Sequence, residues 1–381
     1  MELTKRLKIV IVGRGNAGCV TALHYAYYTR KFSNVDIELI YDPETPTEKV
    51  GQASLVTLPY LLWLAIKISW YKNQTNSTNK FGVVYENWGK KNKYIYHGFN
   101  FAATGLHYDP KSLQDVILNS GLFKVSHQKV DSIANIDADY IFDCRGKRIN
   151  DYSEYNILDN PLNSVIVCQK QGRDINQAWT RAVATPDGWT FVIPNTTNTT
   201  SIGYLYNNEI TSYEEAHKNY SNMFQINQPT DSFTFKNYVA KNPIQGNVIL
   251  NGNRLFFLEP LESTAIQGYL DWARYTFDYI FSGAKKEETV SKFKNYLYQV
   301  KNFINMHYLY GSTYDTPFWN KAPSLITKDN SFQKLLEDVK KIPMIDLIDP
   351  LLYNNKEHMY GQINFWNLKI WLEGVEKNDN I

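Results

Sequence analysis

The sequence predicts an α/β fold that opens with a Rossmann-type βαβ unit. Leu7–Val12 is a continuous apolar run, as expected of a buried strand, and it leads directly into the turn Gly13-Arg-Gly15-Asn-Ala-Gly18. A helix is predicted over Cys19–Tyr28, followed by an alternating strand over Val35–Asp42 that ends in an acidic residue. A strand, a glycine turn, a helix and a second strand with an acidic end form the start of a dinucleotide-binding fold.

The rest of the chain is predicted to be rich in strands first and helical later. The middle of the chain, at about 160–240, is polar and strand-like, and a long helix is expected from Ser263 to Phe281. The other predicted strands are Phe81–Tyr85, Tyr94–Tyr96, Asp139–Asp143, Val248–Leu250 and Leu255–Leu258, and the other predicted helices are Glu287–Leu309, Ser331–Lys341 and Ile363–Val375. We therefore expect one interleaved module over residues 1–285, with its β-rich segment at about 160–240, and a helical cap over residues 286–381.

Composition excludes several classes of protein. With 381 residues, 43% apolar residues, 20% charged residues and a net charge of +2, the chain has ordinary globular values and no charge excess for nucleic acid or an anionic membrane. Three cysteines without short metal-type spacing indicate a reducing compartment and no metal site. Leu58–Ile66, the longest apolar stretch, is too short to cross a bilayer, and no signal peptide is seen. We expect a cytoplasmic protein; oligomeric state is left open, including a homo-oligomer.

The glycine turn predicts a pyrophosphate site. Glycines let the chain bend tightly and let a phosphate approach the free N–H groups at the start of the following helix. Asp42 is placed to accept a hydrogen bond from a ribose hydroxyl, or it serves as a turn residue ahead of Pro43. Both interpretations remain open from the residues alone.

The segment Glu259-Pro-Leu-Glu-Ser-Thr-Ala265 also has two interpretations. Ser263 and Thr264 start a helix, so they form either a helix cap or a site where the N–H groups of Thr264 and Ala265 face an anion or a flavin ring. Glu262 is either a capping partner or a general base. The high aromatic content, 15%, fits aromatic packing as well as an aromatic-lined pocket.

A family resemblance distinguishes between these interpretations. The glycine turn, Val50-Gly-Gln-Ala-Ser54, Gly188-Trp-Thr-Phe-Val-Ile-Pro194 and Glu259–Thr264 occur in the order typical of flavin-dependent tryptophan halogenases. Lys80 precedes Asn87-Trp88 at the spacing of that family's catalytic lysine, and Tyr96-His-Gly-Phe99 is similar to its substrate-binding motif. The chain thus resembles a halogenase with the FAD-binding fold of flavin monooxygenases.

The resemblance implies a role for each group of site residues. FAD, in its reduced form FADH2, would be held by Gly13, Gly15, Asn16, Ala17, Gly18, Asp42, Ala53, Asn253 and Ile266. Halide would lie at Ser263, Thr264 and Ala265, and the substrate ring between His97 and Phe99. Trp189, Phe191, Ile193 and Pro194 would separate the flavin from the substrate, and Lys80 and Glu262 would be catalytic.

The resemblance also implies a reaction. FADH2, O2 and halide would give hypohalous acid, which travels to Lys80 and is either hydrogen-bonded there or converted to a haloamine. Glu262 would orient the halogen donor and accept the proton lost from a small aromatic substrate. No second nicotinamide-binding turn occurs, so a separate flavin reductase is expected to supply FADH2.

Several positions depart from the family pattern. Phe191 replaces a tryptophan, Gln52 and Ser54 replace Glu and Thr, and Ala265 replaces the glycine of the halide site. The short chain, rich in Asn and Lys, fits a phage or viral member whose substrate is not tryptophan. The alternatives are a flavin-dependent aromatic hydroxylase, which needs neither Lys80 nor Glu262, and a non-catalytic nucleotide-binding protein.

Overall fold

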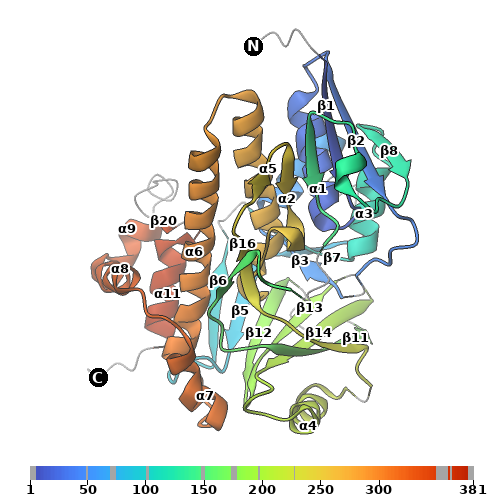
Figure 1. The fold of residues 1–381 in the computed structure, drawn as a ribbon. Helices are drawn as coiled ribbons and strands as arrows, with labels where there is room; N and C mark the ends of the chain where they lie inside the picture. Colours follow the sequence, from blue (N-terminus) through green and yellow to red (C-terminus); the bar gives the residue numbers. More distant parts are fainter. Residues whose placement is uncertain are drawn as a thin grey trace.

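The chain forms two large sheets with helices around them, as seen in a computed structural model (Figure 1). The structure describes residues 6–48, 50–68, 74–99, 103–146, 151–172, 178–195, 198–226, 228–348, 359–360 and 363–375. The predicted α/β class is confirmed.

The first sheet has six strands in the order β17-β18-β9-β1-β2-β8. Its strands are β1 (Leu7–Val12), β2 (Val35–Tyr41), β8 (Lys124–His127), β9 (Tyr140–Asp143), β17 (Ile244–Gln245) and β18 (Val248–Leu250). β1 pairs in parallel with β2 and β9, as a βαβ unit requires. Both faces of β1 are buried: Ile9 and Ile11 join the main apolar cluster, whereas Val10 and Val12 join a smaller one on the opposite face.

Helices α1 (Asn16–Thr29) and α5 (Thr264–Phe281) pack together beside this sheet. A hydrogen bond of 3.0 Å from the Tyr25 hydroxyl to Thr276 Oγ1 joins them in the core. Two further helices lie near α1, namely α2 (Thr57–Ile66) and α3 (Pro110–Leu118). The predicted apolar stretch Leu58–Ile66 is thus a helix that buries its Leu58, Leu61 and Leu62 side chains in the protein.

The second sheet has seven strands in the order β15-β11-β14-β13-β12-β5-β6. Its strands are β5 (Gly82–Glu86), β6 (Tyr94–Gly98), β11 (Ser164–Gln171), β12 (Trp179–Thr185), β13 (Gly188–Pro194), β14 (Thr199–Tyr206) and β15 (Asp231–Thr234). Along β13, Trp189, Phe191 and Ile193 face the main apolar cluster, and Val192 faces a separate cluster with α4 (Tyr213–Phe224). Because both faces are covered, every residue of β13 is buried.

Two small antiparallel sheets complete the core. One contains β3 (Gln52–Ala53), β7 (Gly105–Tyr108) and β4 (Thr78–Lys80), and the other contains β10 (Tyr155–Leu158), β16 (Asn237–Ala240) and β19 (Phe256–Phe257). In Figure 1, β3 and β7 lie between the two large sheets. Lys80 lies at the end of β4 in the first of these sheets, and β4 also contacts β12 of the second large sheet.

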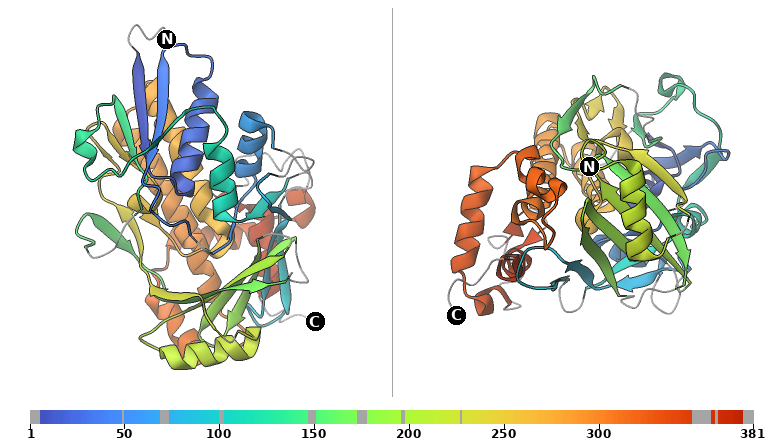
Figure 2. Two further views of the ribbon diagram at one scale, coloured as in Figure 1. Left: turned by 90° about the vertical axis from the view of Figure 1, so that its right-hand side faces the viewer. Right: turned by 90° about the horizontal axis from the view of Figure 1, so that it is seen from below.

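The C-terminal part is helical, as predicted, and lies along one side of the molecule (Figure 2). Its helices are α6 (Lys286–Tyr310), α7 (Pro317–Lys321), α8 (Asn330–Lys341), α9 (Met344–Ile348) and α11 (Phe365–Val375). Ile363–Asn364 form strand β21, paired with β20 (Met359–Tyr360), so the last helix begins two residues later than predicted. α6 packs on α5 and α11 packs on β6, which brings both helices close to the predicted site. None of the helices in the described part of the chain is long and apolar enough to span a membrane.

Candidate active site

The glycine turn has the shape that a pyrophosphate site requires. Gly13 has φ of 113°, and a Cβ atom on Gly18 would lie 1.8 Å from the Gly13 carbonyl oxygen. Gly15 is open by contrast, since the one atom within 4 Å of its ideal Cβ is Glu48 Oε1, at 3.8 Å. Among the described contacts, no side chain caps α1, and its first turn contains no acidic residue. Free N–H groups therefore meet an open approach, so these residues fit the diphosphate of FAD.

Two of the other predicted cofactor residues lie at the first turn of α1. Asn16 Nδ2 donates to Gln52 Oε1 at 2.8 Å, next to Ala53 on β3, and Asn16 Oδ1 accepts from Gln114 Nε2 at 3.1 Å. A Cβ atom on Gly252 would lie 2.7 Å from Ala17 Cβ, so the turn that carries residue 253 also reaches this place.

The remaining three predicted cofactor residues already have partners within the protein. Asp42 follows β2, and its Oδ1 accepts from the Glu44 N–H at 3.0 Å, which is the contact of a turn residue. Asn253 is exposed, and its Oδ1 accepts from the Tyr269 hydroxyl at 3.0 Å. The side chain of Ile266 is buried in an apolar cluster with residues of α1 and α2. Only its backbone, in the first turn of α5, could therefore contact a cofactor.

Lys80 is fully buried, unlike most lysines. Its Nζ donates to Ser263 Oγ at 2.9 Å and lies 5.5 Å from the centre of the Phe99 ring. Burial lowers the pKa of Lys80 to about 7, although the nearby carboxylate of Glu262 opposes this shift. At neutral pH a substantial fraction of this side chain is therefore an unprotonated amine, which is a nucleophile.

The strand that carries Lys80 is held by buried polar contacts that the sequence analysis did not identify. Thr78 Oγ1 donates to the Pro194 carbonyl at 2.8 Å, which ties β4 to the end of β13. His107 on β7 lies between Thr78 and Thr180, with ring nitrogens 3.4 Å and 2.9 Å from their hydroxyl oxygens. These contacts fix the lysine relative to the predicted flavin-wall strand.

The start of α5 is not an ordinary helix cap. Glu262 and Ser263 have φ of 67° and 58°, in the left-handed region that costs a non-glycine residue on the order of 1–3 kcal/mol. Ser263 makes no capping hydrogen bond to the helix, whereas Ser212 caps α4 through the N–H of Glu215. The Ser263 hydroxyl instead accepts from Lys80. The structure therefore contradicts the interpretation of Ser263 as a helix cap and leaves the first N–H groups of α5 without a capping side chain in the described contacts.

The Glu262 carboxylate is bound by two side chains from the second sheet. Its Oε1 accepts hydrogen bonds from the Tyr85 hydroxyl and from His97 Nδ1, the latter at 2.7 Å. Burial alone would raise the pKa of this acid, but the charge and hydrogen bond of His97 and the hydroxyl of Tyr85 lower it to about 2. Glu262 is thus ionised, and no described ion pair joins it to Lys80.

The two residues predicted to hold the substrate ring lie near different catalytic candidates. Phe99 lies beside Lys80, and His97 contacts Glu262. The His97 ring is nearly parallel to Phe303 of α6, at 12°, with 6.0 Å between their centres.

The C-terminal helices supply site residues that the sequence analysis missed. His307 of α6 stacks on Tyr85 with 4.8 Å between ring centres, and Trp371 of α11 lies 4.2 Å from His307. Burial lowers the pKa of His307 to about 3, and its Nδ1 donates to the Phe303 carbonyl at 2.8 Å, so the ring is neutral. The spacing of Phe303 and His307, one helical turn apart, was the only sequence signal, and it is typical of ordinary helix packing.

The predicted flavin wall is an apolar surface on β13. Trp189, Phe191 and Ile193 alternate toward the main apolar cluster, and Trp189 lies 6.3 Å from Phe191 between ring centres. Phe191 stands above Gly203 of β14, where a Cβ atom would come within 2.1 Å of its ring. The phenylalanine that replaces the family's tryptophan is thus packed against a strand without a side chain at that point.

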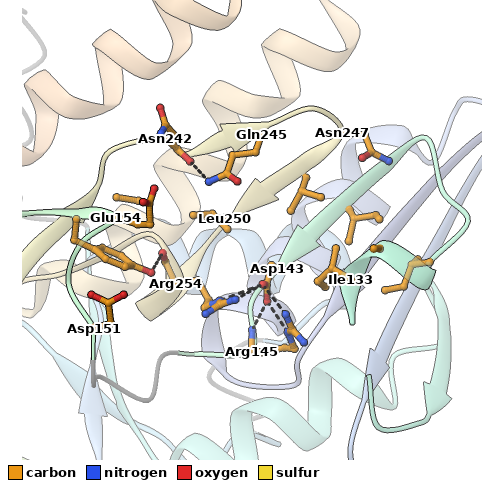
Figure 3. A pocket seen from close by; sticks show the side chains of 16 residues that line it. Ile133, Asp143, Arg145, Asp151, Glu154, Asn242, Gln245, Asn247, Leu250 and Arg254 are labelled. Carbon is orange, nitrogen blue, oxygen red and sulfur yellow. Dashed lines mark hydrogen bonds and ion pairs between the residues drawn. The ribbon is translucent and has the colours of Figure 1, made fainter. Parts of the chain in front are cut away.

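A separate cavity of about 680 Å³ lies on the first sheet (Figure 3). At its centre Asp143 binds both Arg145 and Arg254, with nitrogen–oxygen distances of 2.9 to 3.1 Å. None of the predicted site residues lines this cavity. Both guanidinium groups at its centre are thus paired with the same carboxylate.

The chain is similar in sequence to known proteins. The sequence profile described as tryptophan halogenase matches residues 8–121 and 111–372. The chain is 22% identical over 472 residues to the tryptophan 7-halogenase RebH of Lentzea aerocolonigenes, covering 94% of this chain and 87% of RebH. An alignment with the tryptophan 6-halogenase ThaL of Streptomyces albogriseolus, at 24% identity, covers 61% of this chain and 46% of ThaL.

Solved structures share the fold. The tryptophan 6-halogenase SttH from Streptomyces toxytricini superposes with a TM-score of 0.80 at 17% identity, covering 97% of this chain and 91% of SttH. A tryptophan halogenase from Shewanella frigidimarina superposes with a TM-score of 0.79 at 17% identity, covering 99% and 90% of the two chains.

Proposed function

This chain belongs to the tryptophan halogenase family and is a halogenase, and we propose that it uses FADH2, O2 and halide to halogenate a small electron-rich aromatic compound. The observation that carries the proposal is the buried amine of Lys80, which contacts Ser263 at the first turn of α5. The Lys80 amine lies near the ionised Glu262 carboxylate, and this pairing of an amine with a base suits transfer of an electrophilic halogen.

The glycine turn and the first turn of α1 would bind the diphosphate of FAD. Gly13 and Gly18 give the turn its shape, and the backbone N–H groups after Gly15 face the open approach. When bound, reduced FAD together with O2 and halide supplies hypohalous acid. Trp189, Phe191 and Ile193 would keep water and the aromatic substrate away from the flavin.

The first turn of α5 would hold the halide. Free N–H groups and the positive end of the helix dipole attract an anion here, and Thr264 is buried. Ala265 adds a methyl group where the family has glycine, so the halide site is expected to differ in size from that of the relatives.

Lys80 would deliver the halogen. As a neutral amine it attacks the halogen of hypohalous acid, forming an N–halogen bond and releasing water. The aromatic carbon then takes the halogen as the N–halogen bond breaks, and the electron pair of that bond returns to nitrogen. The ring proton would pass to Glu262 and from there to the nitrogen, which restores the amine. Phe99 beside the amine would orient the ring.

Glu262 would accept the ring proton. It is ionised and held by Tyr85 and His97, so it is a base whose position does not depend on the substrate. His97 would contact the aromatic ring of the substrate directly, and it would also hold the Glu262 carboxylate that accepts the ring proton.

Other predictions extend the proposal. The relatives RebH, ThaL and SttH are tryptophan halogenases, but the shorter chain and Ala265 favour a differently shaped substrate. A separate flavin reductase, a cytoplasmic location and a phage or viral source stay predictions from the sequence.

The test is aerobic turnover with FAD, a flavin reductase and chloride, bromide or iodide, followed by mass spectrometry of a panel of indoles, phenols and pyrroles. We expect halogenated product from the wild type and none from Lys80→Ala, while oxidation of FADH2 continues in both. Glu262→Gln should lower the halogenation rate by about 10²- to 10⁴-fold. Product that gains oxygen without halogen would indicate a hydroxylase, and failure to bind reduced FAD would indicate a non-catalytic protein.

A further inference from the structure

We propose that Tyr85 and His97 are positioning residues that keep the Glu262 carboxylate bonded to the second sheet, so that Lys80 keeps Ser263 rather than a carboxylate as its partner. This inference rests on the proposed function, because it assigns the two residues to the control of the halogen-carrying amine.

The contacts of Glu262 are unusually one-sided. Both the Tyr85 hydroxyl and His97 Nδ1 donate to the same oxygen, Oε1, whereas Lys80 Nζ donates to the neighbouring residue of the chain, Ser263, at 2.9 Å. A buried ammonium and a largely buried carboxylate that lie close together would be expected to form an ion pair. Here the carboxylate instead accepts hydrogen bonds from Tyr85 of β5 and His97 of β6.

The two donors are held rigidly. Tyr85 is fully buried, and its ring is packed by His307 and Trp371, each with 4.8 Å between centres, and by Trp88 at 5.9 Å. His97 is 2% exposed and lies 5.1 Å from the Tyr85 ring. Because both rings are buried among other aromatic rings, the carboxylate is held in place by the second sheet and by helices α6 and α11.

The backbone supports the same geometry. Glu262 and Ser263 are consecutive residues with backbone conformations in the left-handed region. Neither is a glycine, so both residues are strained there. This conformation directs the carboxylate of Glu262 to Tyr85 and His97 while the adjacent hydroxyl meets Lys80. An unfavourable backbone at this point persists because the surrounding contacts require it.

The consequence concerns the charge of Lys80. The charged or titratable groups that face Glu262 are His97 from β6, Tyr85 from β5, His307 from α6 and, at longer range, Lys80 from β4. Glu259 is a further acidic group near Tyr85, and it accepts a hydrogen bond from the Tyr308 hydroxyl at 2.7 Å. If Glu262 were released, its carboxylate would pair with Lys80 and favour the ammonium form, which is not a nucleophile.

The decisive variant is Tyr85→Phe, which removes one hydroxyl and keeps the ring. We expect the rising limb of the pH–rate profile of halogenation to move upward by at least one pH unit, with no change in the rate of FADH2 oxidation. Tyr308→Phe is the matched control, because it removes a buried hydroxyl that is bonded to a different carboxylate, Glu259, and should leave that limb in place. A uniform loss of rate at every pH, with the limb unmoved, would overturn the proposal.

A second pair of variants tests the histidine. His97→Phe removes the donor to Glu262, whereas His97→Asn retains an N–H donor near the position of Nδ1. We expect the rising limb of the pH–rate profile to move upward in His97→Phe and to move upward by less in His97→Asn. Equal profiles for both variants would contradict a role for the hydrogen bond.

A measurement without turnover separates this inference from the proposed function. In cofactor-free protein labelled with ¹⁵N-lysine, the Nζ signal of Lys80, assigned by its loss in Lys80→Met, should titrate at least one pH unit higher in Tyr85→Phe than in the wild type. An unchanged midpoint would overturn the positioning role and leave the halogenase proposal intact. A shifted midpoint in a protein that halogenates no compound of the panel would support the positioning role and overturn the halogenase proposal.

Discussion

Lys80→Met should make the protein more stable at low pH while it abolishes halogenation. Lys80 is fully buried, and burial lowers its pKa from 10.5 to about 7. At about 1.4 kcal/mol for each pKa unit, holding this lysine in the interior costs about 5 kcal/mol once it is fully protonated. The hydrogen bond to Ser263 returns about 1 kcal/mol, so the variant should be more stable by about 4 kcal/mol at pH 6.

The sign of the pH dependence follows from proton binding. Between about pH 7 and 10.5 the unfolded chain carries a proton on Lys80 that the folded protein does not, so the stability of the wild type rises with pH in that window. Methionine has no such dependence. The difference between the two proteins should therefore fall from about 4 kcal/mol at pH 6 to about zero at pH 10.

The assay is urea-induced unfolding of both proteins at pH 6, 8 and 10, with Lys90→Met, at an exposed position, as the control for a change in net charge. A difference between wild type and Lys80→Met that stays constant across pH would refute the buried-amine argument. So would a variant that is less stable than the wild type at pH 6.

Three further predictions concern the cofactor, the halide and a second buried acid. Gly18→Ala should abolish FAD binding, measured by flavin fluorescence, because the added Cβ would lie 1.8 Å from the backbone oxygen of Gly13. An unchanged affinity for FAD would contradict the proposal that the glycine turn binds the diphosphate. Ala265→Gly removes a methyl group from the halide site and should therefore lower the KM for iodide relative to chloride, and identical halide ratios in the two proteins would place the halide elsewhere. Burial raises the pKa of Glu259 to about 7, so the folded protein binds a proton that the unfolded chain releases, and wild-type stability falls from about pH 4.5 to 7. Glu259→Gln should therefore gain up to about 3 kcal/mol relative to the wild type at pH 8 but not at pH 4, by urea unfolding at both values.

Local pattern predicted much of the fold. β1 has the predicted bounds, Leu7–Val12, and the helix that begins after Ser263 ends at Phe281 as expected. These elements were predictable because period, glycine position and apolar runs act over a few residues. The last helix was misjudged by two residues, since Ile363 and Asn364 pair with β20, a contact that no local pattern records.

The order of the motifs supplied candidate site residues, but it did not supply their contacts. Lys80, Glu262 and Phe99 lie near one another, and the order of the motifs was the signal for them. Tyr85 and His307 were missed because an aromatic residue on a buried strand or helix has no signature that separates packing from function.

The sequence by itself determined the glycine turn between β1 and α1, the family and the residue types available for chemistry, because each depends on short-range order along the chain. Only the tertiary structure decided what Lys80 and Ser263 do. These residues are 183 positions apart in the sequence. Because they are in contact in the fold, the Ser263 hydroxyl accepts a hydrogen bond from a buried amine and does not cap the helix. A pKa depends on which distant segments exclude water and which charges they bring near. The chemistry of this lysine is therefore a property of the packed protein and not of the segment that contains it.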